Sequence, residues 1–193
     1  MGFRPPPPFA AWRHREARDG FEVVFVRTEP QGLGLEGQTA AVEAGEAWTV
    51  SYSILVDASW TTQRVHVAGR SAAGRRELTL ERDRAGAWLI DGGAAPQLEG
   101  CLDVDLESSA VTNALPVHRL GLSIGESAEA PAAYVRASDL AVERLEQSYV
   151  RMEDDAGRQR YAYAAPRFGY SGELVYDAYG LVFDYPGLAT RAA

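Results

Sequence analysis

Three carboxylate side chains alternate with apolar residues between positions 101 and 107. Asp103, Asp105 and Glu107 lie two residues apart, so on a β-strand they would share one face at a spacing of about 6.5 to 7 Å. Asp103 and Asp105 at that spacing could act as the acid and base of a hydrolase that cleaves a glycoconjugate, and the trio could bind Ca²⁺ through its oxygens. A half-buried strand also turns a polar row toward water without any ligand. We therefore expect the three carboxylates to face solvent.

Other residues that perform chemistry are isolated. His14, His66 and His118 are far apart and form no zinc-binding pattern, and Cys101 is the single cysteine, which excludes a disulfide or a multi-cysteine zinc site. We expect Cys101 to pack as a small apolar residue. All 19 basic residues are arginines, which excludes a P-loop lysine, a Schiff-base lysine and a lysine general base. The sequence predicts no cofactor and no metal.

The segment from Gly32 to Gly37 spells G-x-G-x-x-G, and Asp57 follows twenty residues later, as in a dinucleotide-binding fingerprint. That fingerprint needs a parallel strand before the first glycine and a helix after the last. Here Pro30 precedes the motif, and Gly45 would end any helix after about two turns. The next apolar segment alternates as an antiparallel strand does. The motif therefore does not predict nucleotide binding.

The overall charge limits the partners. The formal net charge is −8 at pH 7 and the pI is about 4.9, so the field repels phosphate backbones and anionic membrane surfaces. Only Arg75 and Arg76 are adjacent among the arginines, which argues against nucleic acid. No apolar run approaches the roughly 18 residues of a membrane-spanning helix, and the first residues lack the apolar core of a signal peptide. We expect a cytoplasmic protein without transmembrane insertion.

The elements that must position these residues are mainly β-strands. Short segments rich in Val, Tyr, Trp, Leu and Thr recur about every ten residues, separated by Gly, Pro, Asp and Ser, which is typical of an all-β sandwich or barrel. The clearest strand puts these residues on one face: Trp48, Val50, Tyr52, Ile54 and Val56. A second strand is predicted over residues 21–27, where Phe21, Val23 and Phe25 fall on one face, opposite Glu22, Val24 and Val26.

Similar alternation predicts strands over 77–82, 101–107, 133–136 and 181–185. Glycine-containing turns, which connect antiparallel neighbours, are predicted at Asp19-Gly20, Ala73-Gly74, Arg84-Ala85-Gly86, Asp91-Gly92-Gly93, Asp155-Ala156-Gly157 and Tyr170-Ser171-Gly172.

Two segments depart from the strand pattern. Four prolines within residues 1–8 hold an extended polyproline II conformation and predict a proline-rich N-terminal arm. No break in composition follows, so the 193-residue chain is expected to form a single β-barrel domain over 9–193. Between 138 and 152, apolar residues also recur at helical spacing behind Ser138. This segment stays open between helix and strand on its residues alone.

The aromatic content points to a binding surface or to a large core. Nine tyrosines and four tryptophans each carry a polar tip, and seven tyrosines lie in the last third of the chain: Tyr149, Tyr161, Tyr163, Tyr170, Tyr176, Tyr179 and Tyr185. A concave β-surface lined by such rings would suit an amphiphile, with ring bodies against its chain and hydroxyls near its head group. The rings could equally cover the faces of an antiparallel sheet. The residues alone leave both interpretations open.

An ordered set of short motifs carries a family resemblance. Gly100-Cys101-Leu102-Asp103-Val104-Asp105-Leu106, Thr112-Asn113-Ala114-Leu115-Pro116 and Arg119-Leu120 resemble the signature of the glycolipid-binding family, long classed as a domain of unknown function. Asp57-x-x-Trp60-x-Thr62, Gln147-x-Tyr149 and Tyr161-x-Tyr163 continue it, so it covers the chain from about Trp12 to Arg191. This chain departs at Ser109-Ala110-Val111 and Val117-His118, where the family usually has Thr-Pro-Phe and Ile-Arg. A basic side chain is therefore missing at 118.

The resemblance implies a curved, incompletely closed antiparallel β-barrel with an apolar cavity, similar in shape to bacterial lipoprotein carriers. It also implies strand over 140–150 and brings no catalytic residues. The expected function is a non-enzymatic binding or carrier protein for a glycolipid-like or other amphiphilic small molecule. The alternatives are a glycoconjugate hydrolase that uses Asp103 and Asp105, and a protein interaction module that uses open sheet edges. A homo-oligomer also stays open.

The candidate ligand-binding residues combine aromatic rings with polar groups: Trp60, Asp103, Asp105, Asn113, Arg119, Tyr149, Tyr163 and Tyr185. The net charge favours neutral sugar heads unless an arginine such as Arg119 lines the mouth. Asn113 is expected first to bond neighbouring backbone groups, with a ligand role second. Trp60 is expected to cover the core at a corner where Asp57 accepts backbone N–H bonds.

Overall fold

The structure is a computed structural model that describes residues 2–193, and strands form most of it. The strands are β1 (Phe9–His14), β2 (Asp19–Glu29), β3 (Gly32–Glu43), β4 (Glu46–Asp57), β5 (Thr62–Ser71), β6 (Gly74–Arg82), β7 (Trp88–Ile90), β8 (Gly93–Ala94), β9 (Asp103–Leu106), β10 (Ser127–Glu129), β11 (Ala132–Val135), β12 (Val142–Leu145), β13 (Ser148–Arg151), β14 (Gln159–Ala165), β15 (Tyr170–Tyr176), β16 (Val182–Tyr185) and β17 (Ala189–Arg191). The helices are the 3₁₀ turns η1 (Pro96–Leu98), η2 (Val111–Asn113) and η3 (Pro166–Phe168) and the α-helix α1 (Ala114–Leu120). Within residues 2–193, none of these helices has the length and apolar character needed to cross a membrane.

Fourteen strands form one curved antiparallel sheet, in the order β10-β13-β14-β15-β16-β17-β1-β2-β3-β4-β5-β6-β7-β8. The first strand joins the two ends of the chain, because β1 pairs with β17 on one side and with β2 on the other. Across the described residues, the end strands β10 and β8 do not pair with each other, so the sheet is not closed. This confirms the predicted mainly antiparallel, incompletely closed β-barrel.

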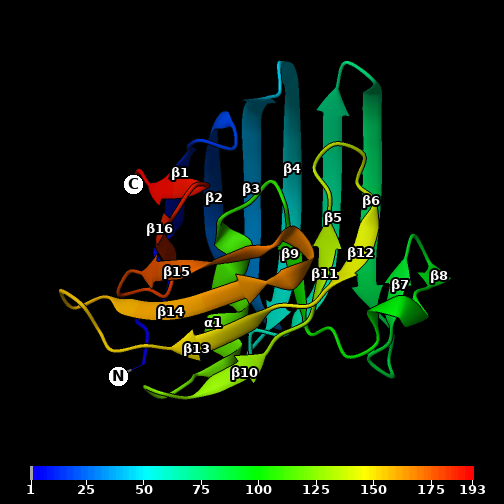
Figure 1. Cartoon of the computed structure of the whole chain (residues 1–193). Coiled ribbons are helices and arrows are strands. Elements are labelled where there is room, and N and C mark those ends of the chain that lie inside the picture. Colours follow the sequence, from blue (N-terminus) through cyan, green and yellow to red (C-terminus); the bar gives the residue numbers. More distant parts are fainter. Residues whose placement is uncertain (1) are drawn as a thin grey trace.

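A smaller sheet lies inside this curve. It has the order β12-β11-β9, and β9 runs parallel to β11 with Asp105 opposite Tyr134. In Figure 1 the long strands β2 to β6 stand upright, β13 to β15 cross in front of them, and α1 lies between. The segment 138–152, open between helix and strand on its residues alone, contains β12 and β13, as the family resemblance implied.

The long strands show how neighbouring strands decide which face is buried. In β4 the predicted face is buried throughout, from Trp48 to Val56. In β2 the buried residues are Glu22 and Val24, whereas Phe21 and Phe25 are 44% and 54% exposed. Pairing fixes this choice, because β2, β3 and β4 align so that Val24 shares the inner face of β4.

Two predicted turns are wrong. Gly20 lies within β2 and Gly172 lies within β15. Both glycines are required by close approach instead, since a Cβ on Gly20 would lie 2.7 Å from the Ala40 carbonyl oxygen and one on Gly172 would lie 2.6 Å from the Tyr170 hydroxyl. The other predicted turns do connect strands, and Gly74 and Gly157 among them have positive φ.

The interior has two clusters of buried residues. One cluster joins the inner faces of β1 to β7 with β9 and the segment 110–115, and it consists mainly of aliphatic side chains and tryptophans. The second joins β13 to β16 with Val117 of α1, Tyr134 and Leu145, and five of its members are buried tyrosines besides Tyr134. Cys101 is buried and free in the first cluster, as predicted. The segment from β9 to α1 therefore separates two differently composed layers.

Candidate functional site

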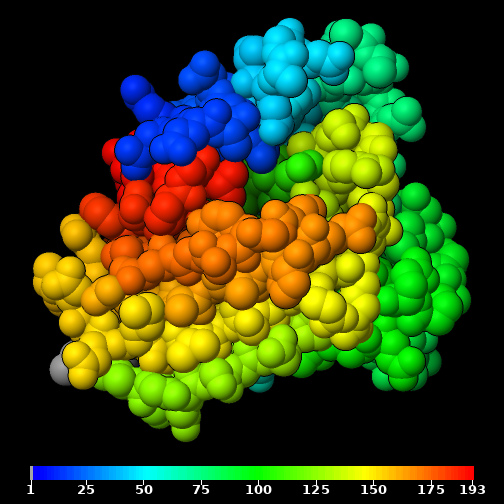
Figure 2. Space-filling model, viewed as in Figure 1, coloured from blue at the N-terminus to red at the C-terminus, as the bar shows by residue number. Residues whose placement is uncertain are grey.

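A cavity of about 390 Å³ lies between the two layers, the aliphatic one and the tyrosine-rich one. Its walls come from the β1–β2 corner, the segment after β9, the β14–β15 connection and the chain between Tyr185 and Ala189. Figure 2 shows it as a hollow between the blue and red segments, with orange residues at its rim and a green segment in its floor. The volume is within the range of small-molecule binding sites, which is about 300 to 1,000 Å³.

His14, the last residue of β1, forms part of the polar side of the cavity. It is 5% exposed, and its Nε2 makes no hydrogen bond with any described residue. Glu22 lies behind it, with Oε2 4.0 Å from Nε2. Burial, together with a smaller contribution from the nearby charge of Arg18, lowers the pKa of His14 to about 4. His14 is therefore neutral at pH 7.

Arg18 stands beside His14 and is 6% exposed. Its Nη1 donates a hydrogen bond to the Glu107 carbonyl oxygen at 3.0 Å, and its guanidinium carbon lies 5.3 Å from the centre of the Trp48 ring. Its Nε makes no hydrogen bond within residues 2–193, although a Glu43 carboxylate oxygen lies 3.8 Å away. Arg18 is thus fixed in place while one donor stays unused.

Glu22 anchors the wall behind these two residues. It is fully buried and accepts hydrogen bonds from the Tyr52 hydroxyl at 2.6 Å, the Ala110 backbone N–H at 2.7 Å and the Ser109 hydroxyl. Burial raises its pKa, although each of these three hydrogen bonds acts in the opposite direction. The network ties β2 and β4 to the segment that follows β9.

The carboxylate row does not face solvent, so that expectation is wrong. Asp103 is fully buried, and Arg119 Nε and Nη2 donate to its two oxygens at 3.0 and 2.6 Å. Asp105 is 9% exposed, lines the cavity and accepts a hydrogen bond from the Thr112 hydroxyl at 3.1 Å. Strand β9 is an edge strand of the three-stranded sheet, but all four of its residues are buried, so both of its faces are covered, which alternation alone does not reveal.

The ionisation of Asp105 is altered by its position. Its pKa is raised to about 6, mainly by burial; the Thr112 hydrogen bond opposes the rise, and the charges of Glu107 and Asp103 contribute to it. Asp105 is therefore largely ionised at pH 7 but takes up a proton in mildly acidic solution. A partly buried carboxylate that faces a cavity is a suitable acceptor for ligand hydroxyl groups.

Aromatic rings form the opposite side of the cavity. The ring centres of Tyr163, Tyr170 and Tyr185 lie 5.7 to 6.1 Å from one another. The Tyr163 hydroxyl donates to Gln147 Oε1 at 2.9 Å and the Tyr170 hydroxyl donates to the Pro186 carbonyl at 3.2 Å. Burial raises the pKa of all three tyrosines, so they stay neutral. Phe168, which is half exposed, and Leu188, which packs against the second cluster, add further apolar surface to the lining.

Residues 9–191 match the sequence profile of the family described as “Putative glycolipid-binding”. The chain belongs to this glycolipid-binding family. Its match spans the cavity and both layers of the fold. Among curated proteins, none matches the chain.

Two solved structures resemble this family member. The crystal structure of a DUF1089 family protein from Pseudomonas aeruginosa is 33% identical, has a TM-score of 0.76, and the alignment covers 99% of this chain and 96% of that one. A β-barrel-like protein of the domain of unknown function DUF1849 from Brucella abortus is 10% identical, with a TM-score of 0.52 and coverage of 95% and 93%. The second likeness concerns the fold alone.

The predicted site residues of this glycolipid-binding family member fall into three groups. Asp105, Asn113, Tyr163 and Tyr185 line the cavity. Tyr149 lies behind the wall, where its hydroxyl donates to Asn113 Oδ1 at 3.2 Å. The rest lie outside the lining: Asp103, Arg119 and Trp60.

Trp60 has a structural position at the predicted corner. Asp57 Oδ1 accepts backbone N–H bonds from Ser59 at 2.8 Å and Thr61 at 3.0 Å, as predicted. The Trp60 ring packs against the first cluster and stacks on His118 with ring centres 3.7 Å apart. Arg119 does not line the cavity, and the arginine in the lining is Arg18.

Sequence reasoning missed the residues of the polar side, namely His14, Arg18, Glu22 and Ser109. No short motif joins them, because they come from β1, the β1–β2 connection, β2 and the segment after β9. One signal was present: Glu22 interrupts the inner face of a long strand, and a buried carboxylate needs partners. Among residues 2–193, no group of three or more His, Cys, Asp or Glu side chains has the arrangement of a metal site.

Proposed function

We propose that this protein binds one amphiphilic, glycolipid-like molecule in the cavity and acts as a non-enzymatic carrier. The observation that carries the proposal is the two-sided lining: His14, Arg18 and Asp105 offer polar atoms, while Tyr163 and Leu188 belong to the apolar side. An amphiphile needs both kinds of surface in one site. The family membership, with its glycolipid-binding description, supports the same ligand class.

Burial of the apolar part of the ligand supplies the affinity. Each methylene removed from water contributes about 0.8 kcal/mol, so a chain of about ten carbons gains several kcal/mol after the costs of association. The rings of Tyr163, Tyr170 and Tyr185 are held by edge-to-face contacts and hydrogen bonds. A wall that is already ordered loses little side-chain freedom when a ligand binds.

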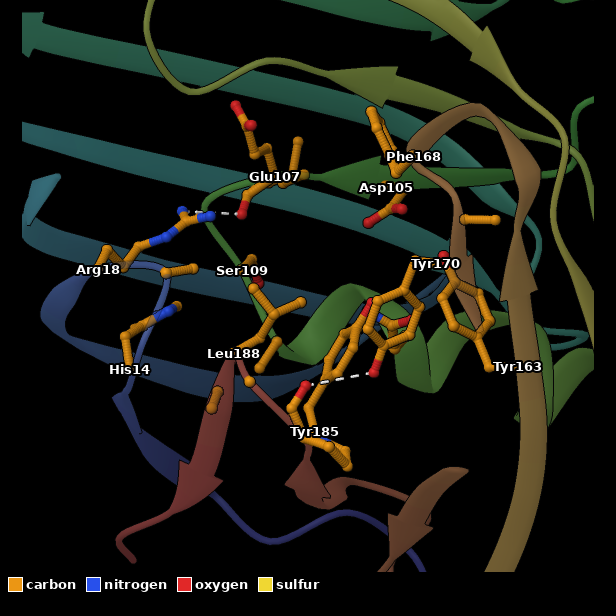
Figure 3. Close-up of a pocket in the computed structure, with 18 of the residues that line it drawn as sticks. His14, Arg18, Asp105, Glu107, Ser109, Tyr163, Phe168, Tyr170, Tyr185 and Leu188 are labelled. Carbon is orange, nitrogen blue, oxygen red and sulfur yellow. Dashed lines mark hydrogen bonds between the residues drawn. The ribbon is translucent and has the colours of Figure 1, made fainter. Parts of the chain in front are cut away.

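The two alternative functions lack such support. A hydrolase that used Asp103 and Asp105 needs both carboxyls at the ligand, but Asp103 is paired with Arg119 outside the cavity lining. The Glu107 carboxylate accepts a hydrogen bond from the Ala137 backbone N–H at 2.7 Å, and in Figure 3 it points away from Asp105.

An interaction module would use the open edges of the large sheet, but its end strands β8 and β10 have only two and three residues. Edges this short offer little backbone to another strand.

A fluorescent fatty-acid probe tests the proposal by titration of the purified protein. We expect saturable binding at micromolar protein. Leu188→Trp places a larger ring in the cavity and should weaken the probe at least about tenfold. Val150→Trp is the matched control, because Val150 lies on β13, is exposed and is outside the cavity lining.

Two results would contradict the proposal. One is a lack of saturable probe binding, and the other is an equal effect of Leu188→Trp and Val150→Trp on affinity. Native mass spectrometry of protein purified from its own host, followed by lipid extraction, then identifies the natural ligand. A carrier should retain one lipid molecule per chain in that experiment.

A further inference from the structure

The polar side of the cavity contains hydrogen-bonding atoms that the protein itself leaves unused. His14 Nε2 and Arg18 Nε have no hydrogen-bond partner among residues 2–193, and both side chains are more than nine-tenths buried. Buried polar groups in folded proteins almost always have partners. Figure 3 shows both side chains on the same side of the cavity, beside Ser109. A bound molecule could therefore complete the hydrogen bonding of this wall.

An acceptor faces these atoms from the other side. The Asp105 carboxylate extends into the same space from β9, opposite Arg18 and His14 (Figure 3). The Thr112 hydroxyl occupies its Oδ1 at 3.1 Å, and an ionised carboxylate accepts further hydrogen bonds through its remaining lone pairs. The cavity thus offers a guanidinium donor on one side and a carboxylate acceptor on the other.

Few chemical groups satisfy both sides at once. A hydroxyl group donates and accepts, so neighbouring hydroxyls can accept from Arg18 Nε and donate to Asp105. A phosphate or a carboxylate offers acceptors without donors at neutral pH and would face the Asp105 charge. An ammonium group offers donors only, or none when it is fully methylated, and would face the Arg18 charge.

We propose that Arg18, His14 and Asp105 select a neutral head group rich in hydroxyls, a sugar or polyol, over phosphate, carboxylate and ammonium heads. This specificity rests on the binding function proposed above. It assigns a head-group role to His14 and Arg18, on the β1–β2 corner, and pairs them with Asp105 across the cavity. The hydrocarbon chain then lies against the apolar residues of the lining, Phe168 and Leu188 among them.

The charges around the cavity support this selection. Arg18 is the only cationic side chain of the lining within residues 2–193 at neutral pH, because His14 is uncharged there, whereas Glu43, Asp105 and Glu107 also line it. An anionic head group would be repelled by three carboxylates and attracted by one guanidinium, which is already hydrogen-bonded to the Glu107 carbonyl and lies 3.8 Å from the Glu43 carboxylate. A neutral polyol avoids that repulsion.

Displacement of the fatty probe by four compounds with the same eight-carbon chain tests the selection. The compounds are octyl glucoside, octyl phosphate, octanoate and octyltrimethylammonium, each used below the concentration at which it forms micelles. We expect octyl glucoside to bind at least about tenfold more tightly than the other three. Because the chains are identical, the difference measures the head group alone.

Two conservative variants separate specificity from loss of structure. Asp105→Asn removes the negative charge. The affinity for octyl glucoside should therefore fall about tenfold, whereas octyl phosphate should bind more tightly than it does to wild type. Arg18→Gln removes the guanidinium. The affinity for octyl glucoside should therefore fall, and octyltrimethylammonium should bind more tightly than it does to wild type. Opposite changes in one variant cannot come from partial unfolding. Arg27→Gln is the control, since Arg27 is an exposed residue of β2 paired with Glu36.

The outcomes keep the two proposals distinguishable. Equal affinity for all four compounds, or a preference for octyl phosphate, would overturn the head-group selection while the binding function stands. Parallel weakening of every compound by Asp105→Asn would also overturn it, because Asp105 would then act only through the fold. If neither the probe nor any of the four compounds binds, both proposals are wrong.

Discussion

The half of the sheet formed by β2 to β6 and the half formed by β13 to β16 cover the same interior with different chemistry. The first buries mainly Val, Ile, Leu and Trp side chains, among them Val50, Ile54 and Leu80. The second buries tyrosines, which contact one another at 5.1 to 6.5 Å between ring centres. Tyrosine brings a hydroxyl into the core, and each buried hydroxyl needs a partner.

Those partners hold the tyrosine half, which forms one side of the cavity, in place. The Tyr149 and Tyr176 hydroxyls donate to the side chain and backbone of Asn113, and the Tyr163 hydroxyl donates to Gln147. Hydrogen-bonded rings keep fixed positions without filling every gap, whereas aliphatic side chains close-pack. The comparison teaches that the aliphatic half supplies stability and the tyrosine half supplies a shaped, partly polar wall. Four predictions test this division, from the largest effect to the smallest.

Ile54→Ala should have the largest effect. Ile54 is fully buried in β4, so its truncation should lower the free energy of unfolding by about 2 to 5 kcal/mol, through lost burial and an unfilled cavity. Probe affinity per folded molecule should stay unchanged, because Ile54 lies outside the cavity lining. Urea denaturation measures the first quantity and probe titration the second. A loss below about 1 kcal/mol would mean that the aliphatic half does not dominate stability.

Asp105→Asn should stabilise the ligand-free protein in a pH-dependent way. The folded pKa of Asp105 is raised from 3.8 to about 6, so the wild type loses stability as pH rises through about 6, because the unfolded chain ionises more readily. Asparagine cannot ionise. The variant should therefore gain about 3 kcal/mol over wild type at pH 7.5 and less than about 1 kcal/mol at pH 4. A difference that does not depend on pH would contradict the burial of an ionising Asp105.

Asn113→Ala should cost less, about 1 to 3 kcal/mol, because it leaves the buried Tyr149 hydroxyl without its acceptor. Tyr176→Phe is the comparison variant: it removes the hydroxyl that donates to the Asn113 carbonyl at 3.1 Å and preserves the ring. Thermal and urea unfolding of both variants measure the effect. An unchanged melting temperature in both would show that the hydrogen bonds between the tyrosine half and η2 are dispensable.

Glu77→Ala should have the smallest effect. Glu77 accepts from Arg75 at 2.6 Å in an exposed ion pair on β6, and such pairs contribute about 0 to 1 kcal/mol. Urea denaturation should therefore show a loss in the free energy of unfolding of about 0 to 1 kcal/mol, and high salt should reduce that loss further. Such a result would mean that the two halves differ only in their inner faces. A larger loss, or one that salt does not reduce, would mean that outer-face contacts also distinguish the two halves.

The strands show how far local pattern reaches. Alternation predicted the position and the buried face of β4, since five apolar residues share that face. It did not predict β3, because Gly32, Gly34 and Gly37 leave gaps in the apolar alternation. Gly37 is required inside the sheet, where a Cβ would lie 2.2 Å from the Tyr52 hydroxyl. A glycine needed for close approach looks the same in sequence as a glycine needed for a turn.

The candidate site was predicted in part. The family motifs drew attention to Asp105 and Asn113, and the tyrosine content to Tyr163 and Tyr185, all of which line the cavity. The motifs equally included Asp103, which forms an ion pair with Arg119 elsewhere. Two aspartates on one strand face, two residues apart, carry no local sign of which will meet a cavity and which will meet an arginine.

The sequence by itself determined the antiparallel β architecture, the interior face of β4, the structural corner at Asp57 and the packing of Cys101, because these depend on residues close together along the chain. Tertiary structure alone decided that Glu22 is buried while Phe21 is exposed, and that His14, Arg18 and Asp105 face one cavity. The physical reason is pairing and coverage: the face a strand buries depends on its neighbours and on what covers them. Those contacts join β1, β2 and the segment from β9 onward, and the hydrogen bond from the Ala110 backbone N–H to Glu22 spans 88 residues of sequence.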